Sequence, residues 1–78
     1  KYNINILIEG HTDSIGNSNS NLILSKNRAQ TVYNYLISKS VKSDQISFRG
    51  FGDKMPISSN NTELGRSLNR RTSFRVVD

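Results

Sequence analysis

The chain has 78 residues, with eleven lysines and arginines against six acidic residues, and its formal net charge is +5. It is long enough for one small domain, and apolar residues make up only 33% of it, so its core must be small. It contains no cysteine, which excludes disulfides, thiol nucleophiles and thiolate metal sites. No apolar run approaches the roughly 20 residues that a membrane-spanning helix needs.

The first predicted elements are a strand and a polar loop. Isoleucines at every second position predict a strand over residues 3–9, with their side chains on one face. The strand is expected to end at Gly10. The stretch over residues 10–21 is dense in Gly, Ser, Asn and Asp, and this composition predicts a loop.

Beyond this loop the apolar residues recur at every third or fourth position instead of every second, and this spacing predicts a helix over residues 21–39. One of residues 19–21 is expected to cap its start, since Asn and Ser side chains accept from free backbone N–H groups. Its end near Ser40 lacks the Gly that favours a left-handed C-terminal cap. The face expected to be buried consists of Leu22, Ser25, Ala29, Val32, Tyr33 and Leu36.

The second half of the chain predicts a strand over residues 45–50, a short helix over 62–69 and a strand over 72–77. Two glycines and a proline are expected to end the first of these strands and to begin a loop. Thr62 is a suitable helix cap, and Phe74 is expected in the core. The order βαβαβ predicts an α+β fold, a two-layer sandwich with helices packed on one face of a small mixed sheet.

His11, Asp13 and Ser14 are the residue types of a nucleophilic triad, and a hydrolase is one hypothesis for this loop. Neighbours within one loop rarely align a base with a nucleophile, so a locally hydrogen-bonded His11 is the preferred interpretation. His11 has no second His or Cys with which to hold a metal. We therefore expect no catalytic residues, no metal and no cofactor.

A second hypothesis is a basic nucleic-acid-binding domain. Clustered arginines can bind phosphates, although no aromatic platform interleaves with them here. Paired arginines at a helix end also complement its dipole, which is a structural explanation for part of the cluster. The residues that would carry this function are Arg49, Arg66, Arg70, Arg71 and Arg75.

Asp13 and Arg28 form the most informative pair. Asn21 and Arg28 fall on one flank of the predicted helix, and the loop that carries Asp13 leads back to the start of that helix. A carboxylate and a guanidinium on one groove suit a zwitterionic ligand, which offers an ammonium and a carboxylate. The alternative is an internal ion pair between Asp13 and either Arg28 or Arg70, and the spacing alone favours this alternative.

The motifs resemble those of the OmpA-like peptidoglycan-binding domain, over nearly the whole chain and in order. No single motif is decisive, but together they are specific. In the first half the matching residues are Gly10 to Asp13, Gly16, Asn21, Leu24, Ser25, Arg28, Ala29, Val32, Tyr35 and Leu36. In the second half they are Gly50 to Gly52, Pro56, Asn60 to Thr62, Gly65, Arg66 and Asn69 to Arg71.

The resemblance implies a non-enzymatic module that binds peptidoglycan through the meso-diaminopimelate of its stem peptide and anchors an outer-membrane or envelope protein to the cell wall. It implies a place on the periplasmic face of the outer membrane and no nucleic-acid partner. It also reverses the preference for an internal ion pair of Asp13. The implied ligand-binding residues are Asp13, Arg28, Asn21, Leu24, Thr12 and Arg70.

Two departures from the family pattern bear on stability. Members usually begin with a further strand and helix, so we expect residues 1–78 to be a single domain truncated at its N-terminus. A sheet edge or core face would then be exposed, and a homodimer through that edge could cover it. Ser40 stands where members often have the helix-ending Gly, and we expect a modest loss of stability there.

Overall fold

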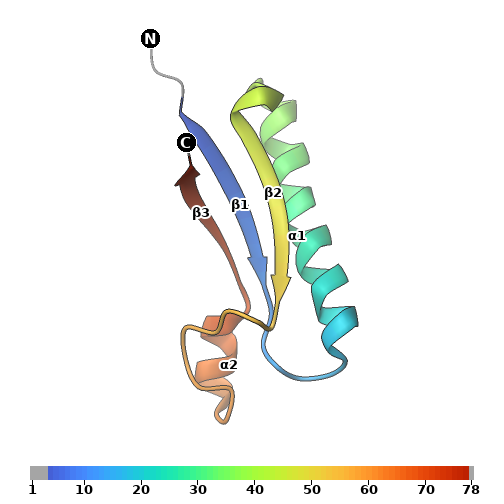
Figure 1. Ribbon diagram of the computed structural model, residues 1–78, viewed down its shortest axis with the longest axis vertical. Helices are drawn as coiled ribbons and strands as arrows, with labels where there is room; N and C mark the ends of the chain where they lie inside the picture. The colour runs from blue at the N-terminus through green and yellow to red at the C-terminus, as the bar shows by residue number, and fades with distance from the viewer. Residues whose placement is uncertain (1–3, 78) are drawn as a thin grey trace.

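The element order is strand, helix, strand, helix, strand, as predicted, with one added 3-10 turn (Figure 1). The computed structural model describes residues 4–77. No helix in this range is both long and apolar enough to cross a membrane. The elements are β1 (Asn5–His11), α1 (Ser18–Ser38), η1 (Ser43–Gln45), β2 (Ile46–Gly52), α2 (Glu63–Asn69) and β3 (Arg71–Val77).

The three strands form one mixed sheet in the order β2-β1-β3. β1 pairs with β2 in parallel and with β3 antiparallel, so Ile8 of β1 lies between Phe48 and Phe74. α1 runs along β2 and β1, whereas α2 lies beyond the end of the sheet at which β1 and β2 finish (Figure 1). The α+β fold with a small mixed sheet is therefore confirmed, but the expected packing of both helices on one face was wrong for α2, which lies beyond the end of the sheet.

The strands do not end at their first glycines, and this prediction was wrong. β1 continues to His11 and β2 to Gly52, because the glycines lie where α1 approaches the sheet. A Cβ on Gly10 would lie 2.0 Å from the carbonyl oxygen of Ser25, and one on Gly50 would lie 2.4 Å from the backbone nitrogen of Lys26. These glycines permit close helix–sheet packing.

α1 begins three residues before its predicted start, so the expected cap within residues 19–21 was also wrong. Asn17 is the cap, and its side-chain oxygen accepts from the backbone N–H of Ser20 at 3.0 Å. The helix ends at Ser38, and Ser40 follows with a φ of 73°. Ser40 thus adopts the left-handed conformation that a glycine would adopt at less cost.

The core is as small as the composition predicts. Ile8 and Ala29 are fully buried, and Ile46 is 8% exposed. Phe74 was expected in the core but is 60% exposed. It shares a sheet face with Ile8, but α1 covers the β1–β2 side of that face and leaves β3 open. Phe74 and Val76 thus leave an apolar part of this face exposed, and a homodimer that would cover it remains a prediction.

Candidate ligand-binding site

The loop between β1 and α1 is held in one shape by its own polar groups. The Thr12 N–H donates to the Gly52 carbonyl at 2.8 Å, and its hydroxyl donates to the Asp13 carbonyl at 2.8 Å. Asn21, in the second turn of α1, reaches back and donates to the Ile15 carbonyl at 2.9 Å. Thr12 and Asn21 therefore shape the loop, and both are buried.

Asp13 is the centre of the site. Its Oδ1 accepts from the Ile15 N–H at 3.0 Å and its Oδ2 from Arg70 Nη1 at 2.6 Å, while its side chain is 12% exposed. The Arg70 hydrogen bond, followed by that from Ile15, lowers the pKa of the Asp13 carboxyl. Of the two ion pairs considered for Asp13, the one with Arg70 is formed.

Glu63 joins this pair and was not predicted from the sequence. Its Oε2 accepts from Arg70 Nη2 at 2.6 Å, and its Oε1 lies 3.3 Å from Arg66 Nε. Hydrogen bonding by Arg70 lowers the pKa of Glu63, and the two carboxylates raise the pKa of Arg70. Two acids and two cations make a cluster without net charge. The three-residue spacing of Glu63 and Arg66 on a helix was the available signal.

Asn69 is a second residue whose role the sequence did not disclose. It is fully buried, and its side-chain oxygen accepts from the N–H groups of Ile57 and Ser58 at 2.8 and 3.1 Å. Its amide donates to the Ser58 carbonyl at 3.0 Å and to Asn60 Oδ1 at 2.8 Å. Asn60 Oδ1 in turn accepts from the Ser14 N–H at 3.3 Å, which links this brace to the Asp13 loop.

Arg28 and Leu24 lie outside this network. Both are exposed on α1, and Arg28 forms no ion pair with another residue in the range 4–77. Because Arg28 follows Asn21 by seven residues, it lies about two helical turns, roughly 10 Å, along the same side of α1. The structure therefore brings together Asp13, Thr12, Asn21 and Arg70, with Arg28 left free on the adjoining flank.

His11 does not form the base of a triad. It is 1% exposed at the end of β1, where its ring stacks on Phe51 at a centroid distance of 5.3 Å. Its Nε2 lies 3.4 Å from Glu9 Oε1, while its Nδ1 has no hydrogen-bond partner within the described range. Ser14 is exposed and contacts Asn60 instead. The local hydrogen bond expected of His11 is thus present, but the residue lies at the end of β1 and not in the loop predicted over residues 10–21.

Most of the arginines proposed for nucleic acid already have partners in the chain. Arg66, Arg70 and Arg75 pair with carboxylates, the last with Glu9 at 2.6 Å, and Arg71 donates to the Met55 carbonyl at 3.1 Å. A phosphate backbone would have to compete with these contacts. The geometry therefore gives the nucleic-acid hypothesis no support.

A mixed three-stranded sheet, with α1 packed along it and an ion-paired aspartate in the first strand-to-helix loop, defines a small α+β domain. This chain belongs to the OmpA family, whose model matches residues 1–70. It is 43% identical over 72 residues to outer membrane protein A of Bordetella avium, and it is 41% identical over 71 residues to the peptidoglycan-binding protein ArfA of Mycobacterium bovis.

These matches cover 92% and 91% of this chain but only 37% and 22% of the two relatives. The chain thus spans less than half the length of either curated protein. Its fold is that of the C-terminal domain of Helicobacter pylori MotB, with a TM-score of 0.91 and 29% identity. That superposition covers 100% of this chain and 60% of the MotB domain.

Proposed function

We propose that this chain binds peptidoglycan non-covalently and anchors an envelope protein to the cell wall, from the periplasmic face of the outer membrane. The name of the Mycobacterium relative states that it binds peptidoglycan, and the Bordetella relative is an outer membrane protein. The net charge of +5 favours approach to a wall whose stem peptides carry carboxylates.

The proposed ligand is the meso-diaminopimelate of the stem peptide. The free end of its side chain is a zwitterion, with an ammonium and a carboxylate on one carbon. Asp13 accepts from the ammonium, and Arg28 donates both arms of its guanidinium to the carboxylate. Asn21, Thr12 and Arg70 hold Asp13 in place, and Leu24 offers apolar contact on the same helix.

The observation that carries this proposal is the fixed and ionised carboxylate of Asp13. Each of its oxygens accepts one hydrogen bond within the chain, which leaves a lone pair on each for a ligand ammonium. Because Glu63 and Arg66 complete a cluster without net charge, the ammonium does not meet an excess positive charge from Arg70. Pre-arranged acceptors of this kind bind without the cost of ordering them.

The test is binding to purified sacculi that contain diaminopimelate, with Asp13→Asn compared against Asp44→Asn. Both variants raise the net charge by one, but Asp44 lies in η1, away from the site. We expect Asp13→Asn to weaken binding about ten- to a hundredfold, the cost of one charge-assisted contact, and Asp44→Asn to bind as the wild type does. Equal binding by both would refute the site, since electrostatic adhesion alone responds equally to them.

The ligand itself is tested with Arg28→Gln and with sacculi that carry lysine in place of diaminopimelate. Lysine keeps the ammonium but lacks the second carboxylate. We expect Arg28→Gln to weaken binding to diaminopimelate sacculi about tenfold and to leave the weaker binding to lysine sacculi unchanged. A similar loss on both sacculi would assign Arg28 to another part of the polymer.

A further inference from the structure

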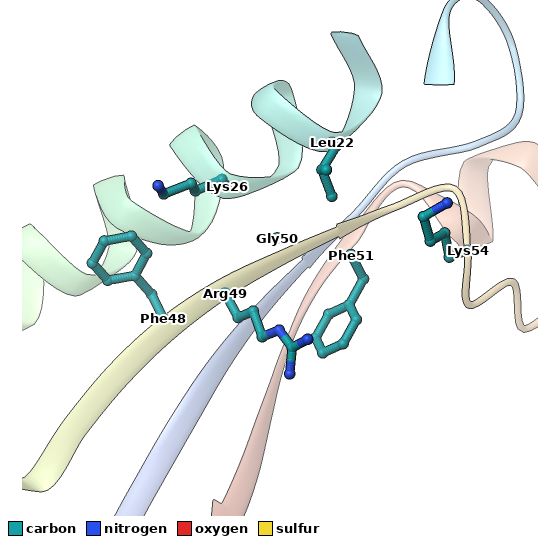
Figure 2. Close-up of a pocket in the computed structure, with 7 residues that line it drawn as sticks. All are labelled: Leu22, Lys26, Phe48, Arg49, Gly50, Phe51 and Lys54. Carbon is teal, nitrogen blue, oxygen red and sulfur yellow. The ribbon is translucent and has the colours of Figure 1, made fainter. Parts of the chain in front are cut away.

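A groove runs along β2, next to α1 (Figure 2). Its volume is about 480 Å³, and none of its lining residues belongs to the ion-paired cluster of Asp13, Glu63, Arg66 and Arg70. Apolar and cationic side chains both line it, and none of its lining residues is acidic. Its principal residues are Leu22, Lys26, Phe48, Arg49, Phe51 and Lys54.

The three cations of this groove differ from the arginines near the Asp13 loop. Lys26 comes from α1, Arg49 from β2 and Lys54 from the loop that follows, and all three are exposed. None of them forms an ion pair with a residue between positions 4 and 77, whereas Arg66, Arg70 and Arg75 each do. Three cations around one groove, none of them in an ion pair within residues 4–77, favour an anionic occupant.

Phe51 gives the groove a rigid apolar wall. Its ring is held by the stack on the buried His11, and Arg49 lies over it at 4.9 Å from the ring centroid. The cation–π contact holds the Arg49 guanidinium beside the groove. It uses the flat face of the guanidinium, so the N–H donors, which lie in the plane of that group, stay available. Arg49 is therefore placed to donate to a carboxylate.

Within the described part of the chain β2 is an edge strand, since the sheet order β2-β1-β3 gives it β1 as its one partner. Backbone N–H and C=O groups on the side of β2 away from β1 are the groups that an extended peptide pairs with when it docks on a sheet, although the Gly52 N–H at the end of the strand already donates to Ser25 Oγ at 2.8 Å. The strand has seven residues, which is roughly 23 Å of edge. We propose that this groove binds an extended acidic peptide segment of a partner protein, with its carboxylates on Lys26, Arg49 and Lys54.

The charges and the dimensions argue against other occupants. A second copy of this chain docked edge to edge would bring two sets of these cations together. A nucleic acid or an anionic membrane takes its affinity from many phosphate contacts, and three cations supply few. An acidic peptide uses both the cations and the free strand edge, and its apolar side chains can lie on Leu22 and Phe51.

The experiment is fluorescence anisotropy with a labelled heptapeptide that has Glu at every second position and Thr or Val between. Lys26→Glu/Lys54→Glu is compared with the control Lys39→Glu/Lys42→Glu at the far end of α1. Reversing two charges takes the net charge from +5 to +1 in both variants. We expect the groove variant to bind at least tenfold more weakly than the wild type and the control to change less than twofold.

Asp13→Asn separates this proposal from the proposed function, because it should leave peptide binding unchanged while it lowers sacculus binding. Equal weakening by the groove and control variants would overturn the proposal, since it would show a response to net charge alone. Equally tight binding of a single-stranded oligonucleotide or of phosphatidylglycerol vesicles would overturn the assignment to a peptide. Absence of peptide binding would show that these cations only protect the strand edge.

Discussion

Arg70 donates through Nη1 to Asp13 Oδ2 at 2.6 Å, although the two residues lie 57 positions apart in the chain. The contact ties the junction of α2 and β3 to the loop between β1 and α1. Through its other arm Arg70 also holds Glu63, at 2.6 Å. One guanidinium thus orders the carboxylate at the centre of the proposed site.

Arg70→Gln should therefore change stability in a pH-dependent way. In the wild type, Arg70 lowers the pKa of Asp13 and of Glu63 below their ordinary values of 3.8 and 4.5. The resulting stabilisation is present above those values and is lost as the pH falls through the lower, folded pKa values. The deficit in unfolding free energy of Arg70→Gln should be full at pH 7 and should narrow from about pH 5 towards pH 2.

Urea unfolding at a series of pH values measures this difference. Lys42→Gln removes one positive charge from an exposed residue and serves as the control. Its difference from the wild type should stay nearly constant over the same range. A deficit of Arg70→Gln that does not vary with pH would show that Arg70 acts through packing and not through the two carboxylates.

His11 predicts a second pH effect, between about pH 5 and 7. Histidine is the one side chain whose ordinary pKa lies in this range, and His11 is the single histidine of the chain. Burial and the positive charge of Arg71 lower its pKa below 6.5, and Glu9 opposes this shift. The unfolded chain thus binds a proton more readily, and stability should fall as the pH drops below about 6.5. His11→Phe, which keeps a ring against Phe51, should flatten this decline between pH 7 and 5, as measured by urea unfolding.

The elements themselves were predictable because hydrophobic period is a local property. The strand ends were not, since the conformation of Gly10 and Gly50 depends on how closely α1 approaches the sheet. Without that tertiary contact, a glycine after an apolar run is typical of the end of a strand. The exposure of Phe74 has the same origin, because it depends on which strands α1 covers.

The candidate site, too, could be predicted only in part. Asp13 stood out as a loop carboxylate, but spacing along the chain could not decide between Arg28 and Arg70 as its partner. Arg70 reaches Asp13 because α2 lies at the end of the sheet and β3 returns antiparallel to β1. The contacts of Asn69 depend on how the loop over residues 57–60 folds back on α2, which hydrophobic period does not reveal, whereas the Glu63–Arg66 pair could have been found from its three-residue spacing.

Asn69→Ala should be strongly destabilising. Asn69 is fully buried and makes four hydrogen bonds to the segment over residues 57–60. Truncation leaves several buried polar groups without partners, and we expect a loss of about 3 kcal/mol in unfolding free energy. The exposed Asn61 is the control, and Asn61→Ala should change stability by less than about 0.5 kcal/mol. Thermal unfolding followed by circular dichroism measures both, and equal effects would contradict the proposed brace.

Ser40→Gly should stabilise the protein without a change in binding. Ser40 has a φ of 73°, in the left-handed region where a Cβ costs about 1 kcal/mol, and it follows directly after the cap of α1. Removal of that Cβ should raise the melting temperature by roughly 4–8 °C for a domain of this size. Ser40→Ala keeps the Cβ and should give no such gain, so a comparable rise in both variants would assign the effect to loss of the hydroxyl. Because Ser40 lies at the opposite end of α1 from Asn21, affinity for sacculi should stay that of the wild type.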